Sequence, residues 1–281
     1  MDKRDKNRRI HIKKNRRFTY CILVITIFAV VFYAIKFNPK IENKESIKKI
    51  VKTEEVIDKD NIPKISHMSG KDQLESRKLK ESKIVVIDPG HGGYDGGAVA
   101  NSGELEKDIV LDIALQVGKI LKDNNIRVEY TRIDDDITWP SSEQKNLEAR
   151  AKVSNDIGAD LFVSIHCNYL DDFSVKGVEA WCRTENTPSE FLAKEILNEL
   201  DKVKYTNKRN VKYESDGYLA ILNGVESPAT LIELGFLSNK EDATVLISSE
   251  GKKKIAEGIA NGIINYVKLQ KSNNELNSSE E

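Results

Sequence analysis

From Ile84 onward, short apolar runs alternate with longer segments of helical periodicity. The strand-like runs are Ile84–Ile87, Arg127–Thr131, Leu161–His166, Val178–Trp181 and Thr230–Leu234. The helix-like segments are Lys107–Asn124, Leu147–Ile157, Glu190–Leu200 and Lys252–Val267. Strands that alternate with helices are typical of a largely parallel sheet with helices on both faces. We therefore expect one α/β domain of this kind.

Two histidines directly follow buried strand-like runs. His91 lies in a glycine-rich turn, Asp88–Gly93, after the first run, and His166 closes the run that begins at Leu161. In an open α/β sheet, ligands collect outside the carboxyl ends of the strands. Two imidazoles at that edge, with acids nearby, are what a catalytic zinc ion needs. For either histidine alone, a hydrogen-bonded structural role is the better explanation, and the surrounding motifs favour the zinc site. A glycine-rich turn alone is weak evidence, because such turns also bind phosphate.

A carboxylate near the start of the first helix-like segment is the candidate third ligand. Glu106 is one residue before Lys107, and Glu104 is its rival for the same role. An acid at a helix amino terminus also has a purely structural explanation, because it stabilises the helix dipole by about 0.3–1 kcal/mol.

Glu233 is a charge inside the otherwise apolar strand-like run at Thr230–Leu234. Burying an unpaired carboxylate is costly, so the residue needs a partner or a function. One interpretation is an ion pair with Arg132 or Arg150. The other is a general base beside zinc-bound water.

The residues after His166 follow the alternation of a strand. If His166 faces the cleft, Cys167 faces away and Asn168 returns to the cleft side, where it can hydrogen-bond a substrate amide. Cys167 and Cys182 can pair outside the cell, but two cysteines do not make a disulfide framework. We expect both to be small buried residues.

The amino terminus predicts a membrane anchor. Residues 1–17 hold nine Lys and Arg against two Asp, and residues 18–35 carry no charge. Such a run is about long enough to cross a bilayer core of ~30 Å, and its basic flank stays in the cytoplasm. We expect a transmembrane helix over 18–37 with the remainder outside the cytoplasm. A cleaved signal peptide, and hence a secreted protein, is the alternative.

Composition divides the rest of the chain. Residues 38–82 are rich in Lys, Glu, Asp and Ser and predict a polar linker. A catalytic domain is expected over 83–268 and a disordered polar tail over 269–281. From Ile84 onward there are 22 Lys and Arg against 34 Asp and Glu, a net charge of −12. Such an acidic domain argues against a nucleic-acid partner, because phosphate binding needs a basic face.

Four motifs together resemble a known family. They are His91 with its glycine-rich turn, Glu106–Asp108, Ser164–Asn168 and Glu233–Asn239, within about 83–268. This set resembles the zinc-dependent N-acetylmuramoyl-L-alanine amidases of bacterial cell walls, of the amidase-3 type. The resemblance implies about six strands, one zinc ion held by His91, Glu106 and His166, and Glu233 as the catalytic acid/base. It also implies hydrolysis of the amide between N-acetylmuramic acid and L-alanine of the stem peptide in peptidoglycan.

Other functions stay open at this stage. One is a zinc peptidase that cuts within the stem peptide, and another is a catalytically silent wall-binding or regulatory module. The silent module is disfavoured because all four site positions are filled. A phosphate-binding protein is disfavoured by the acidic domain and by the absence of a P-loop Lys-Ser/Thr.

Regulation and biological role are further expectations from the resemblance. Some relatives carry an inserted helix that blocks the zinc, after the strand matching Val178–Trp181. Here Cys182–Pro188 leads directly into the next helix-like segment. We therefore expect restraint by other means, such as an activator protein or the tether. A role in the spore cortex is possible, beside growth and daughter-cell separation.

Overall fold

The computed structural model describes residues 82–217 and 220–278. In chain order its elements are β1 (Ile84–Pro89), α4 (Glu106–Asp123), β2 (Arg127–Tyr130), α5 (Glu143–Asp156), β3 (Leu161–Asn168), β4 (Val178–Trp181), α6 (Pro188–Val203), β5 (Lys208–Lys212), α7 (Ala220–Asn223), β6 (Ala229–Phe236), α8 (Lys240–Ile247) and α9 (Ser249–Ser278). The expected basic arm, membrane anchor and all but the last residue of the linker lie outside the described residues. Within the described part, no helix is long and apolar enough to cross a membrane.

The six strands form one sheet in the order β2-β1-β3-β6-β4-β5. β2, β1, β3 and β6 are parallel to their neighbours. β4 runs antiparallel to β6 and pairs in parallel with β5. The mostly parallel sheet expected from the alternating pattern is thus confirmed, with a reversed pair of strands at one edge.

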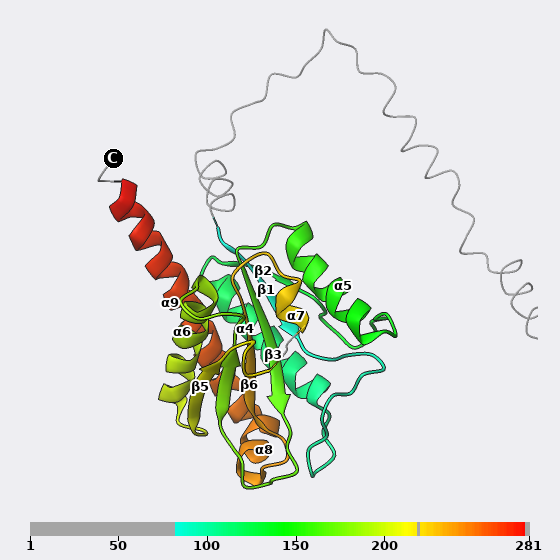
Figure 1. Cartoon of the computed structure of the whole chain (residues 1–281). Helices are drawn as coiled ribbons and strands as arrows, with labels where there is room; N and C mark the ends of the chain where they lie inside the picture. Colours follow the sequence, from blue (N-terminus) through cyan, green and yellow to red (C-terminus); the bar gives the residue numbers. More distant parts are fainter. Residues whose placement is uncertain (1–81, 218–219, 279–281) are drawn as a thin grey trace, which may run out of the picture. The chain divides into compact units, whose positions relative to one another are not determined.

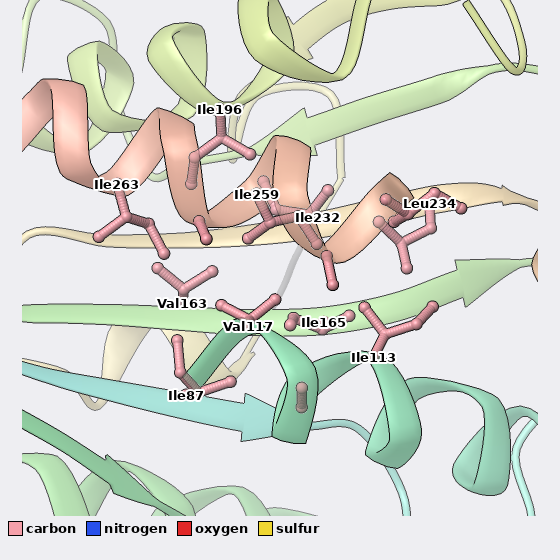
Figure 2. Packing of buried hydrophobic residues seen from close by; sticks show 14 of the residues in the cluster. Ile87, Ile113, Val117, Val163, Ile165, Ile196, Ile232, Leu234, Ile259 and Ile263 are labelled. Atoms are coloured by element: carbon pink, nitrogen blue, oxygen red, sulfur yellow. The ribbon is translucent and has the colours of Figure 1, made fainter. Parts of the chain in front are cut away.

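Helices cover both faces of this sheet, as expected (Figure 1). On one face, alternate residues of the central strands pack against α4, α6 and α9; Ile87, Val163 and Ile232 are examples, and all three are fully buried (Figure 2). On the other face, a smaller cluster that includes Phe162 and Leu231 packs against α5 and α7. Each such aliphatic or aromatic side chain contributes roughly 1.5–3 kcal/mol to stability by leaving water.

The face that packs against α5 and α7 changes from apolar to polar along the strands. On β3, Phe162 is followed two and four residues later by Ser164 and His166, and on β6 Leu231 is followed by Glu233. Residues two apart share a face of a strand. The polar groups therefore gather at the carboxyl ends of β3 and β6, on the face opposite the larger core.

Three short elements were not predicted, namely β5, α7 and α8. β5 is an edge strand whose sequence, Lys208–Lys212, offers Val211 as its single apolar residue. The start of α8 is set by Asn239, whose side chain accepts hydrogen bonds from the backbone N–H groups of Glu241 and Asp242. Short elements such as these form because of contacts with residues distant in sequence or because of local capping. Neither cause gives the sequence a long periodic pattern of apolar residues, so the elements could not be predicted from periodicity.

The last helix is longer than the helix-like segment predicted from the sequence. α9 continues through residues 269–278 instead of ending near Val267. A helix that is already nucleated and packed extends at little cost, because each further residue adds a hydrogen bond.

Helices α6 and α9 approach each other closely at Gly262. A Cβ at this position would meet the Cα of Ile196 and lie 2.8 Å from its backbone nitrogen. We expect Gly262→Ala to lower the free energy of unfolding by about 1–3 kcal/mol, because the backbones must separate. This loss outweighs the ~1 kcal/mol that alanine gains over glycine in a helix.

Gly258→Ala, on the same helix, is the matched control. A Cβ there meets Leu200 Cδ2, the end of a flexible side chain, at 2.9 Å. Chemical denaturation of the two variants should place the Gly262→Ala midpoint below that of Gly258→Ala. Equal midpoints would show that the α6–α9 contact adjusts without cost.

Candidate metal centre

Three side chains from distant parts of the chain converge at the polar end of the sheet. His91, Glu106 and His166 each offer one ligand atom, and these atoms lie within 4.8 Å of one another. Glu106 Oε1 is 3.0 Å from His91 Nε2 and 3.1 Å from His166 Nδ1. Glu104, the rival third ligand, is exposed and accepts a hydrogen bond from Ser102. The structure therefore brings together the three ligands that the resemblance implied.

The backbone conformation of the turn after β1 directs the side chain of His91 toward the other two ligands. His91 has a φ of +59°, a left-handed conformation that is uncommon for a residue with a side chain. Two buried guanidinium groups hold the turn: Arg132 Nη2 donates to Gly90 O at 2.7 Å, and Arg150 donates to His91 O. At Gly90, any Cβ would collide with the ring of His166. The absence of a side chain there lets the second imidazole lie against the turn.

Glu106 is the first residue of α4 and is almost completely buried. Its Oε2 accepts from Ala98 N and its Oε1 from Cys167 N, both at 2.9 Å. Burial opposes ionisation, but the hydrogen bonds from His166 and His91 hold the pKa of Glu106 well below its usual value. The carboxylate is therefore anionic and fixed in orientation, as a metal ligand must be.

Asp95 orients His91. Its Oδ2 lies 2.8 Å from His91 Nδ1, which leaves Nε2 directed at Glu106. Burial lowers the pKa of His91, but the carboxylates of Glu106 and Asp95 outweigh it and raise the pKa above the ordinary value. A carboxylate on the outer nitrogen of a ligand histidine is a common way to fix its ring. Sequence reasoning missed Asp95, although an acid four residues after His91 in the same turn was an available signal.

The donor set fits a catalytic zinc ion. Two imidazole nitrogens and one carboxylate oxygen are the ligands of one common class of zinc hydrolases, which keep a fourth position for water or substrate. His91 and His166 are each about one-fifth exposed, so the group opens toward solvent.

Glu233 lies beside this group on β6, where it is the register partner of His166. Its buried Oε2 has no hydrogen-bond partner among the described residues. The alternative ion pair is not formed: Arg150 binds Asp88 at 2.9 Å, and Arg132 binds carbonyl groups, among them those of Pro89 and Gly90.

Burial raises the pKa of Glu233 to about 7. His166 opposes this shift, whereas the carboxylates of Glu106 and Glu179 add to it. A carboxyl group with such a pKa can both take up and release a proton near neutral pH, although a bound cation would lower the value.

The two residues after His166 lie on opposite faces, as the strand alternation predicted. Cys167 is buried in the larger core, away from the metal group, and within the described residues both it and Cys182 are free thiols. Asn168 returns to the polar face, where its Nδ2 donates to Glu179 Oε1 at 3.3 Å. Its role in binding a substrate amide stays a prediction.

A cavity of about 540 Å³ adjoins the metal group. His91 and His166 form part of its wall, and Glu143, Asn146 and Ile221 from α5 and α7 form another part. This volume is in the range of binding sites for small organic molecules. A small organic group can therefore be held next to the candidate metal ligands.

Comparison with known proteins agrees with this geometry. The N-acetylmuramoyl-L-alanine amidase family model (Amidase_3) matches residues 85–265. The germination-specific N-acetylmuramoyl-L-alanine amidase of Bacillus subtilis is 35% identical over 191 residues, covering 66% of this chain and 79% of that protein.

Two solved structures share both fold and sequence with the chain. The catalytic domain of CwlV from Bacillus (Paenibacillus) polymyxa has 32% identity and a TM-score of 0.59, and the match covers 66% of this chain and 98% of that one. CwlD from Clostridioides difficile, solved in complex with the GerS lipoprotein, has 32% identity and a TM-score of 0.62, covering 67% and 100%. Since the family model spans more than half of the sequence and includes all four site residues, this chain belongs to the N-acetylmuramoyl-L-alanine amidase family.

Proposed function

We propose that this amidase hydrolyses the bond between N-acetylmuramic acid and L-alanine in peptidoglycan with a zinc ion held by His91, Glu106 and His166, and with Glu233 as acid/base. The observation that carries the proposal is the position of Glu233. Glu233 is the register partner of His166, on the polar face of the sheet that carries the converging ligands, and one oxygen of its buried carboxyl group has no partner among the described residues. An amide hydrolase needs a proton acceptor for water at this place.

Each site residue has a separate role in the proposed reaction. When bound, zinc supplies Lewis-acid polarisation of the scissile carbonyl and of the attacking water. Glu233 accepts the proton of that water as it attacks the carbonyl carbon, and returns it to the alanine nitrogen as the amide bond breaks. Asn168, on the same face, is proposed to hydrogen-bond a substrate amide.

As a cell-wall amidase, the protein acts outside the cytoplasm. We propose that residues 18–37 anchor it to the membrane, with a secreted form after signal cleavage as the alternative. The basic flank and the uncharged run support the anchor.

A regulatory partner and a spore-specific role are also proposals. The CwlD structure contains that amidase with a lipoprotein, which supports an activator protein for this chain. The germination-specific B. subtilis relative supports a role in the spore cortex.

Digestion of purified peptidoglycan tests the reaction. Full-length protein should release stem peptides that begin with free L-alanine, and mass spectrometry of the products should show this release stop with a chelator and resume with zinc. Shortened stems still attached to muramic acid would identify a peptidase instead. No product from a folded, zinc-loaded protein would point to a binding role or to a missing activator.

Glu233→Gln tests the acid/base. Glutamine keeps the size of the side chain but cannot take up the proton, so we expect zinc content and thermal stability close to wild type. Activity should fall by about 10²–10⁴-fold, the usual contribution of general acid–base catalysis. Near-normal turnover in the zinc-loaded variant would remove Glu233 from the mechanism.

Glu106→Gln and His166→Ala test the ligand set. Glu106→Gln replaces an anionic carboxylate with a neutral amide, and His166→Ala removes the imidazole, so we expect each variant to lose most of its zinc, measured by elemental analysis after dialysis. Glu104→Gln is the matched control, because this nearby carboxylate is exposed and outside the metal group. A fully zinc-loaded Glu106→Gln or His166→Ala variant would refute the assignment.

A further inference from the structure

A pair of cations lies beyond Glu233, on the side away from His166. His166, Glu233 and Glu179 are register partners across β3, β6 and β4. Arg209 and Lys212, on the neighbouring strand β5, both bind Glu179. Because adjacent strands are about 4.8 Å apart, the backbone of β5 lies roughly 10 Å from that of β6.

Glu179 holds both cations in place. This carboxylate is completely buried, and its Oε2 accepts from Arg209 Nε at 2.7 Å. Its Oε1 lies 3.0 Å from Lys212 Nζ and accepts from Trp181 Nε1 at 3.2 Å. The Lys212 ammonium also lies over the Trp181 ring, 4.9 Å from its centroid. The carboxylate thus has several donors, and the two cationic side chains are ordered before any ligand arrives.

Two cations contact one carboxylate in this arrangement. Two cations share the single charge of Glu179, and the side chains of Arg209 and Lys212 are 35% and 33% exposed. An ammonium group has three donors, so Lys212 can donate to a second acceptor. The positive charge stands out because the chain from Ile84 onward has a net charge of −12. An ordered, accessible cation pair beside a catalytic carboxylate is suited to an anionic part of the substrate.

Resting on the proposed function, we propose that Arg209 and Lys212 bind a carboxylate of the stem peptide and so determine which way the substrate crosses the sheet. The stem peptide carries free carboxylates, whereas the muramic carboxyl group is consumed in the scissile amide. The stem therefore extends over β4 and β5. The sugar occupies the cavity beside α5, where Glu143 and Asn146 can accept hydrogen bonds from hydroxyl groups.

The distance limits which carboxylate is bound. An extended chain spans at most about 3.3–3.6 Å per residue, so roughly 10 Å corresponds to two or three residues from the scissile bond. The carboxylate then belongs to the second or third residue of the stem.

Matched muropeptides test this specificity. The substrates carry the free acid throughout, a carboxamide at the second stem residue alone, or a carboxamide at the third alone. For zinc-loaded, full-length wild type, we expect one of the two amidations to lower kcat/KM by about tenfold, as for loss of a charge-assisted hydrogen bond. High salt should reduce this preference, because the cations are partly exposed.

In Lys212→Met, the ratio of kcat/KM for the free-acid substrate to kcat/KM for the amidated substrate should fall close to one. In Lys212→Arg this ratio should stay as in wild type. Lys208→Gln is the control on the same strand, because Lys208 binds Asn198 on α6 instead of Glu179. Both kcat/KM values in this ratio are measured on the same preparation of a variant, so a loss of folded protein lowers both equally and leaves the ratio unchanged. Equal rates for all three substrates in wild type, or an unchanged ratio in Lys212→Met, would overturn the inference. Failure of wild type to cleave any substrate would instead count against the proposed function.

Discussion

The carboxylate of Glu106 receives hydrogen bonds from three separate segments: the turn after β1, the stretch before α4 and the end of β3. A buried charge without such partners would cost several kcal/mol. These segments must therefore be in place together, and the sheet order that sets β1 beside β3 is what brings them there. The metal group is in this sense a product of the tertiary fold, since its residues are up to 75 positions apart in the sequence.

Buried polar residues next to the metal group stabilise the turn that contains His91. Asp88 accepts hydrogen bonds from Thr131 and Ser164 and pairs with Arg150. Burial raises the pKa of Asp88, but the Arg150 charge and these hydroxyl groups outweigh it and keep the pKa below its ordinary value. The unusual backbone of His91 is thus imposed by a network of strong hydrogen bonds, as is common for strained residues at functional sites.

The reversed strands β4 and β5 extend the polar face beyond the catalytic residues. Across β3, β6 and β4, His166, Glu233 and Glu179 form one row, spaced by the distance between strands. In the proposed mechanism, this row supplies the metal ligand His166 and the proton carrier Glu233, and Glu179 holds the two cations proposed to bind the substrate. Glu179 lies in an apolar strand just as Glu233 does, so the same sequence signal marked both residues, although only Glu233 was interpreted.

The sequence by itself determined the α/β class, because the change between strand and helix periodicity is a local property of the chain. With the family resemblance, it also predicted His91, Glu106, His166 and Glu233 as site residues, since each interrupts or closes a regular pattern. Only the tertiary structure decided between Glu106 and Glu104, and only it excluded an ion pair from Arg150 to Glu233. It alone revealed that Arg209 and Lys212 bind Glu179 beside the site. These features depend on which strands are adjacent and on what each charge contacts, and contacts between distant residues leave no periodic trace in a single sequence.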